Sequence, residues 1–71
     1  MHHTRMTVMV NGETREVAER LSVAELLETL AVPPGRVAVE VNEEIVPRQA
    51  YAARHITNGD RIEIVHFVGG G

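Results

Sequence analysis

A chain of 71 residues can form one domain with a small core, and its apolar content of 44% is too high for a disordered chain. With one Tyr, one Phe and no Trp the core must be aliphatic, and so small an interior leaves little room for a ligand pocket, which counts against an enzyme that acts alone. The net charge of −3, with seven scattered arginines and no lysine, argues against nucleic-acid binding.

Several other features are missing from the sequence. No apolar run approaches the length of a membrane span, no secretory leader is evident, and there is no cysteine. We therefore expect a cytoplasmic protein with no disulfide framework, no thiolate site and no association with a membrane.

The N-terminal part of the chain is predicted to form a β-hairpin. Residues 1–5 lack periodicity and are expected to be a disordered start or the remnant of a tag. From Met6 to Val10 the side chains alternate between two faces, which is typical of a strand. Asn11-Gly12 follows, and both residues tolerate the positive φ of a type I′ turn. Glu13 to Ala18 are therefore predicted to return as the second strand.

A short amphipathic helix is predicted next. Ser22 and Glu25 have the spacing of a capping box, in which each side chain accepts a hydrogen bond from the other residue's backbone N–H. The apolar residues that follow recur on one helical face: Val23, Leu26, Leu27 and Leu30. Pro33-Pro34 ends the helix. A helix of about two and a half turns is too short to be stable alone, so it must pack on the strands.

The second half of the chain shows three more strand patterns, separated by turn signals. In chain order we predict a strand over Val37–Asn42, a turn at Glu43-Glu44, a short strand at Ile45-Val46 ended by Pro47, a helical turn within Arg48–Arg54 with Tyr51 at its edge, a turn at Asn58-Gly59-Asp60, and a last strand over Arg61–Val68.

This order of elements predicts an α+β protein with the ubiquitin-like β-grasp fold, in which one main helix crosses one face of a mixed sheet. Residues 6–68 would form the domain and residues 69–71 a flexible C-terminal glycine tail. A right-handed crossover makes the third or the fifth strand parallel to the first. The predicted inward-facing residues are Val8, Val10, Val17, Leu21, Val23, Leu26, Leu27, Leu30, Val39, Val41, Ile62 and Ile64.

The face of the sheet away from the helix is predicted to be a docking surface. Met9, Val65 and Phe67 would project from it beside Ile45, and Val68 follows at the base of the tail. A contiguous exposed apolar patch marks an interaction site. The alternative is that a loop covers these side chains. We favour docking because the last strand leads directly into the tail.

The chain closes on Gly69, Gly70 and Gly71. Three glycines extend roughly 10 Å beyond the strand at about 3.3–3.6 Å per residue. They form an arm without side chains that could enter a narrow slot in a partner. A frayed terminus or a cloning scar would give the same sequence, so the tail alone does not decide its role.

Three segments resemble the thiamine-biosynthesis sulfur carrier proteins, the ThiS family of the ubiquitin-like superfamily. They are Val41-Asn42-Glu43-Glu44-Ile45-Val46-Pro47-Arg48, Gly59-Asp60-Arg61-Ile62-Glu63-Ile64 and Val68-Gly69-Gly70-Gly71. The Asn-x-x-Ile-Val-Pro-Arg element is fairly specific, whereas the terminal Gly-Gly is shared across the superfamily. Tyr51 stands where many relatives have Trp, which is a conservative difference.

The resemblance implies a carrier and not an enzyme. The Gly71 carboxylate would be adenylated by a ubiquitin-activating-type adenylyltransferase (ThiF-like), and Gly69 and Gly70 would give that partner access. The partner would consume ATP, and the carrier would bind no cofactor. A sulfur donor such as a cysteine desulfurase would then allow a thiocarboxylate to form, and thiazole synthase (ThiG-like) would take its sulfur for the thiazole of thiamine.

Other functions share the same fold and tail. A carrier for molybdopterin synthesis or tRNA thiolation would differ only in its partners, a ubiquitin-like modifier would attach to target lysines through Gly71, and a plain binding module would not use the tail. We predict no catalytic residue and no metal site. Neither His55 nor His66 has a carboxylate or nucleophile at recognisable spacing, and His2-His3 lacks a third ligand.

Overall fold

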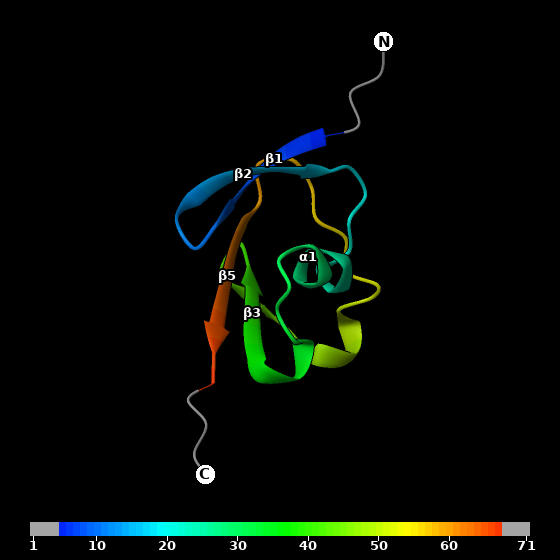
Figure 1. Ribbon diagram of the computed structural model, residues 1–71, viewed down its shortest axis with the longest axis vertical. Coiled ribbons are helices and arrows are strands. Elements are labelled where there is room, and N and C mark those ends of the chain that lie inside the picture. Colours follow the sequence, from blue (N-terminus) through cyan, green and yellow to red (C-terminus); the bar gives the residue numbers. More distant parts are fainter. Residues whose placement is uncertain (1–4, 68–71) are drawn as a thin grey trace.

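The computed structural model describes residues 5–67, and Figure 1 shows a twisted sheet with one helix beside it. The sheet has the strand order β2-β1-β5-β3-β4. The elements are β1 (Arg5–Val10), β2 (Glu13–Ala18), α1 (Val23–Thr29), the 3-10 turn η1 (Pro34–Arg36), β3 (Val37–Val41), β4 (Glu44–Val46), the 3-10 turn η2 (Arg48–Ala50) and β5 (Arg61–His66). β1 and β5 are parallel and the other neighbours are antiparallel. The predicted mixed sheet with a single main helix is confirmed.

The first hairpin forms where the sequence predicts it. Val10 pairs with Glu13, and the two residues between them, Asn11 and Gly12, have φ values of 50° and 83°. These positive angles give the turn a twist that matches the twist of the strands. β1 starts at Arg5, one residue before the predicted start, and Arg5 pairs with Ala18.

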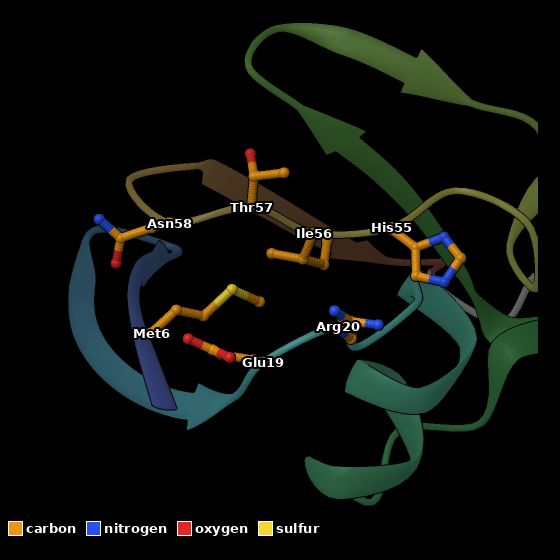
Figure 2. A pocket seen from close by; sticks show the side chains of 7 residues that line it. All are labelled: Met6, Glu19, Arg20, His55, Ile56, Thr57 and Asn58. Carbon is orange, nitrogen blue, oxygen red and sulfur yellow. The ribbon is translucent and has the colours of Figure 1, made fainter. Parts of the chain in front are cut away.

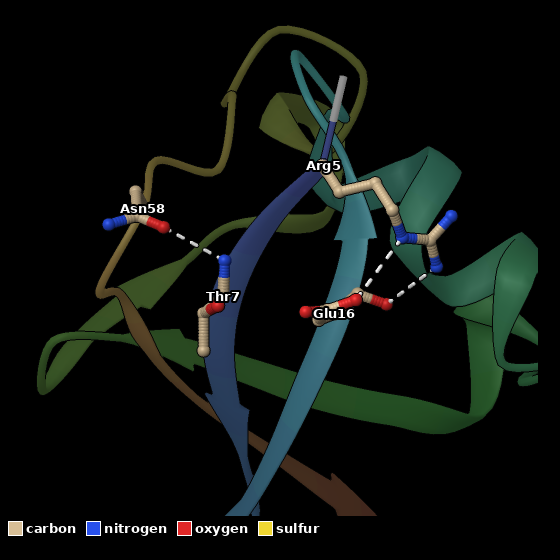
Figure 3. Close-up of polar contacts among 4 residues, drawn as sticks. All are labelled: Arg5, Thr7, Glu16 and Asn58. Carbon is tan, nitrogen blue, oxygen red and sulfur yellow. Dashed lines mark hydrogen bonds and ion pairs between the residues drawn. The ribbon is translucent and has the colours of Figure 1, made fainter. Parts of the chain in front are cut away.

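Two polar contacts of β1, one to β2 and one to the loop before β5, are drawn in Figure 3. Arg5 Nε lies 3.5 Å from Glu16 Oε1 on β2. On the other side of β1, the Thr7 N–H donates to Asn58 Oδ1 at 2.8 Å. The first contact is an exposed ion pair and contributes little to stability. The second fixes the loop that leads into β5.

Both parts of the predicted capping box are present at the start of α1. The Glu25 N–H donates to Ser22 Oγ at 3.1 Å, and the Ser22 N–H donates to Glu25 Oε1 at 2.9 Å. The helix buries Val23, Leu26 and Leu27 and ends at Thr29, before Ala31 adopts a φ of 58°. It is therefore slightly shorter than the apolar stripe, and Leu30 is only partly buried.

The predicted turn at Glu43-Glu44 is wrong by one residue. Val41 pairs with Glu44, so the turn is Asn42-Glu43, and Glu44 belongs to β4. Both turn residues have positive φ, 53° and 70°. Asn tolerates this region, and tertiary contacts hold Asn42 there. Its backbone N–H donates to Arg61 O at 2.7 Å, and its Oδ1 accepts from the Arg61 N–H at 2.9 Å.

The core lies between α1 and the sheet and is aliphatic apart from one Tyr. Of the predicted inward residues only Leu21 and Leu30 are partly exposed, because they lie at the two ends of the helix. Five further hydrophobic residues of the described chain are buried: Met6, Val37, Val46, Tyr51 and Ile56. Tyr51 packs inside, and its hydroxyl donates to Val37 O at 3.4 Å. No helix in the described part of the chain is long and apolar enough to cross a membrane.

Asp60 is a buried carboxylate at the entrance to β5. Its oxygens accept from the Thr57 N–H at 2.8 Å, the Thr57 hydroxyl at 2.9 Å and Asn42 Nδ2 at 2.9 Å. Burial favours the neutral acid, but these three hydrogen bonds, with a smaller contribution from Arg54, outweigh it and hold the pKa of Asp60 below its usual value. The carboxylate thus ties the β3–β4 turn to the loop that starts β5.

Asp60→Ala is expected to lower the free energy of unfolding by about 2 kcal/mol near neutral pH, because the partly buried hydrogen bonds from Thr57 and Asn42 to a charged carboxylate are lost. A depressed pKa stabilises the fold above the unfolded-state pKa, and that contribution disappears as the pH falls through the folded-state pKa. The difference between variant and wild type in urea unfolding should therefore be larger at about pH 7 than at about pH 3, which lies below the unfolded-state pKa. Glu16→Ala, which removes an exposed carboxylate, is the control and should change little. An equal loss at both pH values would contradict this role of the Asp60 charge.

Candidate functional site

The end of β5 is the base of the predicted arm. β3 pairs with β5 as far as Val37–His66, and beyond this pair the Phe67 N–H donates to Arg36 O at 2.9 Å. The backbone is therefore fixed up to Phe67. Val68, Gly69, Gly70 and Gly71 lie outside the described residues, so their predicted roles stay predictions.

Asn11 holds the other edge of β5, which the sequence did not reveal. The parallel ladder between β1 and β5 contains only Met9–Arg61 and Val10–Ile62, because β1 then turns away. The Asn11 side chain replaces the missing strand. Its Nδ2 donates to Ile64 O at 3.1 Å, and its Oδ1 accepts from the Ile64 N–H at 2.7 Å. An Asn in an Asn-Gly turn indicates only the turn, and nothing in its spacing signals this contact.

The four predicted docking residues within the described part of the chain are exposed. The exposed fractions are 40% for Met9, 74% for Ile45, 56% for Val65 and 59% for Phe67. No loop within residues 5–67 covers any of them, which removes that alternative for these residues. Their exposure leaves the docking role itself a prediction.

The strand register divides these residues into two groups. Val65 lies beside Ala38 on β3, and Phe67 follows two residues later, just beyond the end of β5. Ile45 on β4 lines one shallow hollow with Ala38 and Phe67. We call Ala38, Ile45, Val65 and Phe67 the apolar cluster. It adjoins the base of the arm.

Met9 lies apart from the apolar cluster. It is paired with Arg61, and Val65 is four residues further along β5, roughly 13 Å away at about 3.3 Å per residue. Charged side chains fill the space between them: Glu40, Glu43, Arg61 and Glu63 surround one open depression. The open face of the sheet is thus apolar near the arm and charged in the middle.

A second hollow lies beside the start of β1, at the opposite end of the molecule from the end of β5 (Figure 1), and Figure 2 shows the side chains that line it. It has a volume of about 450 Å³ and is lined by Met6, Glu19, Arg20, His55, Ile56, Thr57 and Asn58. All of these except Met6 and Ile56 are exposed, so the hollow is a broad surface depression. His55 Nδ1 lies 3.2 Å from the Ala53 carbonyl oxygen. This contact to the main chain agrees with a structural role for His55.

Within residues 5–67, no group of three or more His, Asp or Glu side chains is placed to hold a metal ion. His66 is exposed at the end of β5 and pairs through its backbone with Val37. The end of the molecule at which β5 finishes is therefore distinguished by the apolar cluster and by the backbone hydrogen bonds that hold β5 as far as Phe67.

A sequence model of the ThiS family matches residues 8–71, which is most of the chain. The chain belongs to the ThiS family. The resemblance of the three sequence segments to this family is confirmed. The crystal structure of the thiamine biosynthesis protein ThiS from Geobacter metallireducens superposes with a TM-score of 0.82 at 42% identity, and the match covers 93% of this chain and 100% of that one. The β-grasp fold is confirmed with it.

Relatives of two lengths match this ThiS-family chain. The sulfur carrier protein ThiS of Escherichia coli is 32% identical over 66 residues, which are 93% of this chain and 100% of that protein. A thiazole synthase of Paramagnetospirillum magneticum is 46% identical over 66 residues, again 93% of this chain but only 20% of that protein. The chain thus spans about a fifth of this longer relative. The relative is named thiazole synthase, and one segment of it is similar to ThiS.

Proposed function

We propose that this ThiS-family chain is a sulfur carrier protein for the thiazole of thiamine. The observation that carries the proposal is a sequence match that covers nearly all of this chain and all of the Escherichia coli protein, which is named as a sulfur carrier. In this proposal Gly71 holds the sulfur as a thiocarboxylate. The chain is a co-substrate of other enzymes and performs no catalysis itself.

Two steps load the sulfur. A carboxylate oxygen of Gly71 attacks the α-phosphorus of ATP, and pyrophosphate leaves, giving an acyl adenylate. A sulfur nucleophile then attacks the acyl carbon, the carbon–oxygen bond to AMP breaks, and a carbon–sulfur bond takes its place. Sulfide completes this exchange directly, whereas a persulfide donor also requires a thiol to reduce the resulting S–S bond. The carboxylate is ionised at neutral pH and needs no base.

The catalytic groups for these steps belong to the partners. An activating adenylyltransferase binds ATP and consumes it, a donor such as a cysteine desulfurase supplies the sulfur, and thiazole synthase accepts it. Because activation requires ATP, the proposal places the carrier in the cytoplasm. Gly69 and Gly70 give the activating enzyme's narrow site access to the terminal carboxylate.

The docking surface in this proposal is the apolar cluster together with Val68. Support comes from the exposure of Phe67, Val65 and Ile45 next to the strand end that leads into the arm. The side chains that contribute most to binding are usually buried together at the centre of an interface. Met9 would contact a partner only if the interface extended across the charged middle of the sheet.

Thiamine is favoured over molybdopterin synthesis or tRNA thiolation by a specific observation. A ThiS-like segment with 46% identity to this chain occurs within a protein named thiazole synthase. Such a combination supports thiazole synthase as the acceptor of the sulfur. A ubiquitin-like modifier remains the alternative of a different class, and it would end linked to a lysine of another protein.

The test uses the full chain, ATP, the activating enzyme of the same organism and sulfide. Intact-mass analysis should show an oxygen-to-sulfur exchange that requires ATP, and addition of thiazole synthase with its other substrates should reverse it while thiazole forms. Sulfur exchange without transfer to thiazole synthase would overturn the thiamine assignment. A mass unchanged with every candidate activating enzyme would overturn the carrier proposal. A covalent adduct with a second protein would support the modifier.

A further inference from the structure

Arg48 lies beside the apolar cluster, in the hollow that Ala38, Ile45 and Phe67 also line. It follows Pro47 at the end of β4 and opens η2, and its side chain is exposed. The guanidinium lies against Gly35 of η1. A Cβ atom added to Gly35 would lie 3.1 Å from Nη2, 3.4 Å from Cζ and 3.6 Å from Nη1. Three atoms of the group at similar distances mean that it lies across the glycine.

The glycine at position 35 is explained by this contact and not by the backbone. The positive-φ glycines among the described residues are Gly12 and Gly59, so Gly35 does not need the conformational freedom of glycine. A Cβ at position 35 would require the guanidinium to shift by a few tenths of an ångström, since a contact of 3.1 Å is tighter than most real Cβ contacts. Gly35 therefore acts as a seat for Arg48.

The seated guanidinium has no polar partner within residues 5–67. The ion pairs found there use Arg5 and Arg15. The arginine side chains that donate hydrogen bonds there are those of Arg5 and Arg54. The hollow that Arg48 shares with Ala38, Ile45 and Phe67 is lined by no Asp or Glu. A rigid fork of N–H donors is thus presented next to apolar side chains, in the geometry that binds a carboxylate.

From this arrangement we infer that Arg48, seated on Gly35, binds a carboxylate side chain of the activating adenylyltransferase when that enzyme docks on the apolar cluster. The inference rests on the proposed function and adds the chemistry of the partner's surface: an acidic side chain next to an apolar socket. The contact orients the carrier as well as attracting it. The docking surface is therefore positively charged at Arg48, on one side of the apolar cluster. It is negatively charged at Glu40 and Glu63, on the other side, so a partner with complementary charges can bind in only one orientation.

The experiment measures how the initial rate of thiocarboxylate formation depends on carrier concentration, at low and high salt. Arg48→Ala should raise the KM for the carrier by about tenfold at low salt with kcat and the KM for ATP unchanged, and should weaken the salt dependence of that KM. Arg48→Lys should recover part of the loss because it restores the charge without the planar fork. Gly35→Ala keeps the charge but displaces the group, and should raise the KM by a smaller factor.

Arg20→Ala is the matched control, because Arg20 is also exposed but lines the second hollow, beside the start of β1 (Figure 2). It should leave all constants unchanged. Each variant is first checked by urea unfolding, so that a loss of fold is not taken for a loss of binding. If Arg48→Ala retains the wild-type KM and salt dependence, the inference is overturned while the carrier function stands. A change confined to the KM for ATP would assign Arg48 to the nucleotide phosphates and overturn it too. If wild-type protein is not thiolated at all, the proposed function fails, and this inference fails with it.

Discussion

A chain extended by a single residue after Gly71 is expected to form no thiocarboxylate while its free energy of unfolding stays at the wild-type value. The extension moves the reacting carboxylate by about 3.3–3.6 Å along the arm. Displacement of a reacting group by even about 1 Å can cost a factor of about 100 in rate. The fold is unaffected because the last hydrogen bond described at this end is made by Phe67. Intact-mass analysis after incubation with ATP, the activating enzyme and sulfide measures the first effect, and urea unfolding measures the second.

Gly70→Val tests the same idea without changing the length of the chain. A branched side chain restricts the backbone and widens the arm where the proposal requires a narrow approach. It too should abolish the sulfur exchange. The control is one extra residue at the N-terminal side, because β1 starts at the opposite end of the molecule from the end of β5 (Figure 1). A protein extended after Gly71 that is still thiolated would refute Gly71 as the carrier site.

The parts of the fold that the sequence predicts correctly are those that depend on neighbouring residues. Asn11-Gly12 specifies its turn because both residues accept positive φ, and the capping box is formed by Ser22 and Glu25 within one helical turn. The error at the β3–β4 turn has the opposite origin. Asn42 adopts positive φ because Asp60 and Arg61, far along the chain, bind its amide group. No local pattern reports such a contact.

The candidate site shows the same division. Alternation along the first and last strands predicted from the sequence correctly places Met9, Val65 and Phe67 outside the core, and all three are exposed. It does not predict which of them are neighbours, because only two residue pairs join β1 to β5 and they place Met9 beside Arg61. The seat of Arg48 on Gly35 is also tertiary, since η1 and η2 are separated by the whole β3–β4 hairpin.

Phe67→Asp is expected to raise the KM of the activating enzyme for the carrier by about 100-fold, the size of effect seen when a central side chain of an interface is removed. Phe67 is the largest side chain of the apolar cluster and lies next to the arm, so a partner that encloses the arm must cover it. Its exposed side chain contributes little to the core, and its backbone N–H would still donate to Arg36. The rate of thiocarboxylate formation as a function of carrier concentration measures the effect, and urea unfolding verifies the fold.

Met9→Asp is the matched control, because it places the same charge on the same face of the sheet. Glu40, Glu63 and Arg61 separate Met9 from the apolar cluster, so an interface centred on Phe67 need not reach it. We expect its KM to rise by less than about threefold, as for a residue at the rim of an interface. A loss as large as that of Phe67→Asp would mean that the partner covers the entire open face. Wild-type constants for Phe67→Asp would remove the apolar cluster as the docking surface and leave the arm as the main contact.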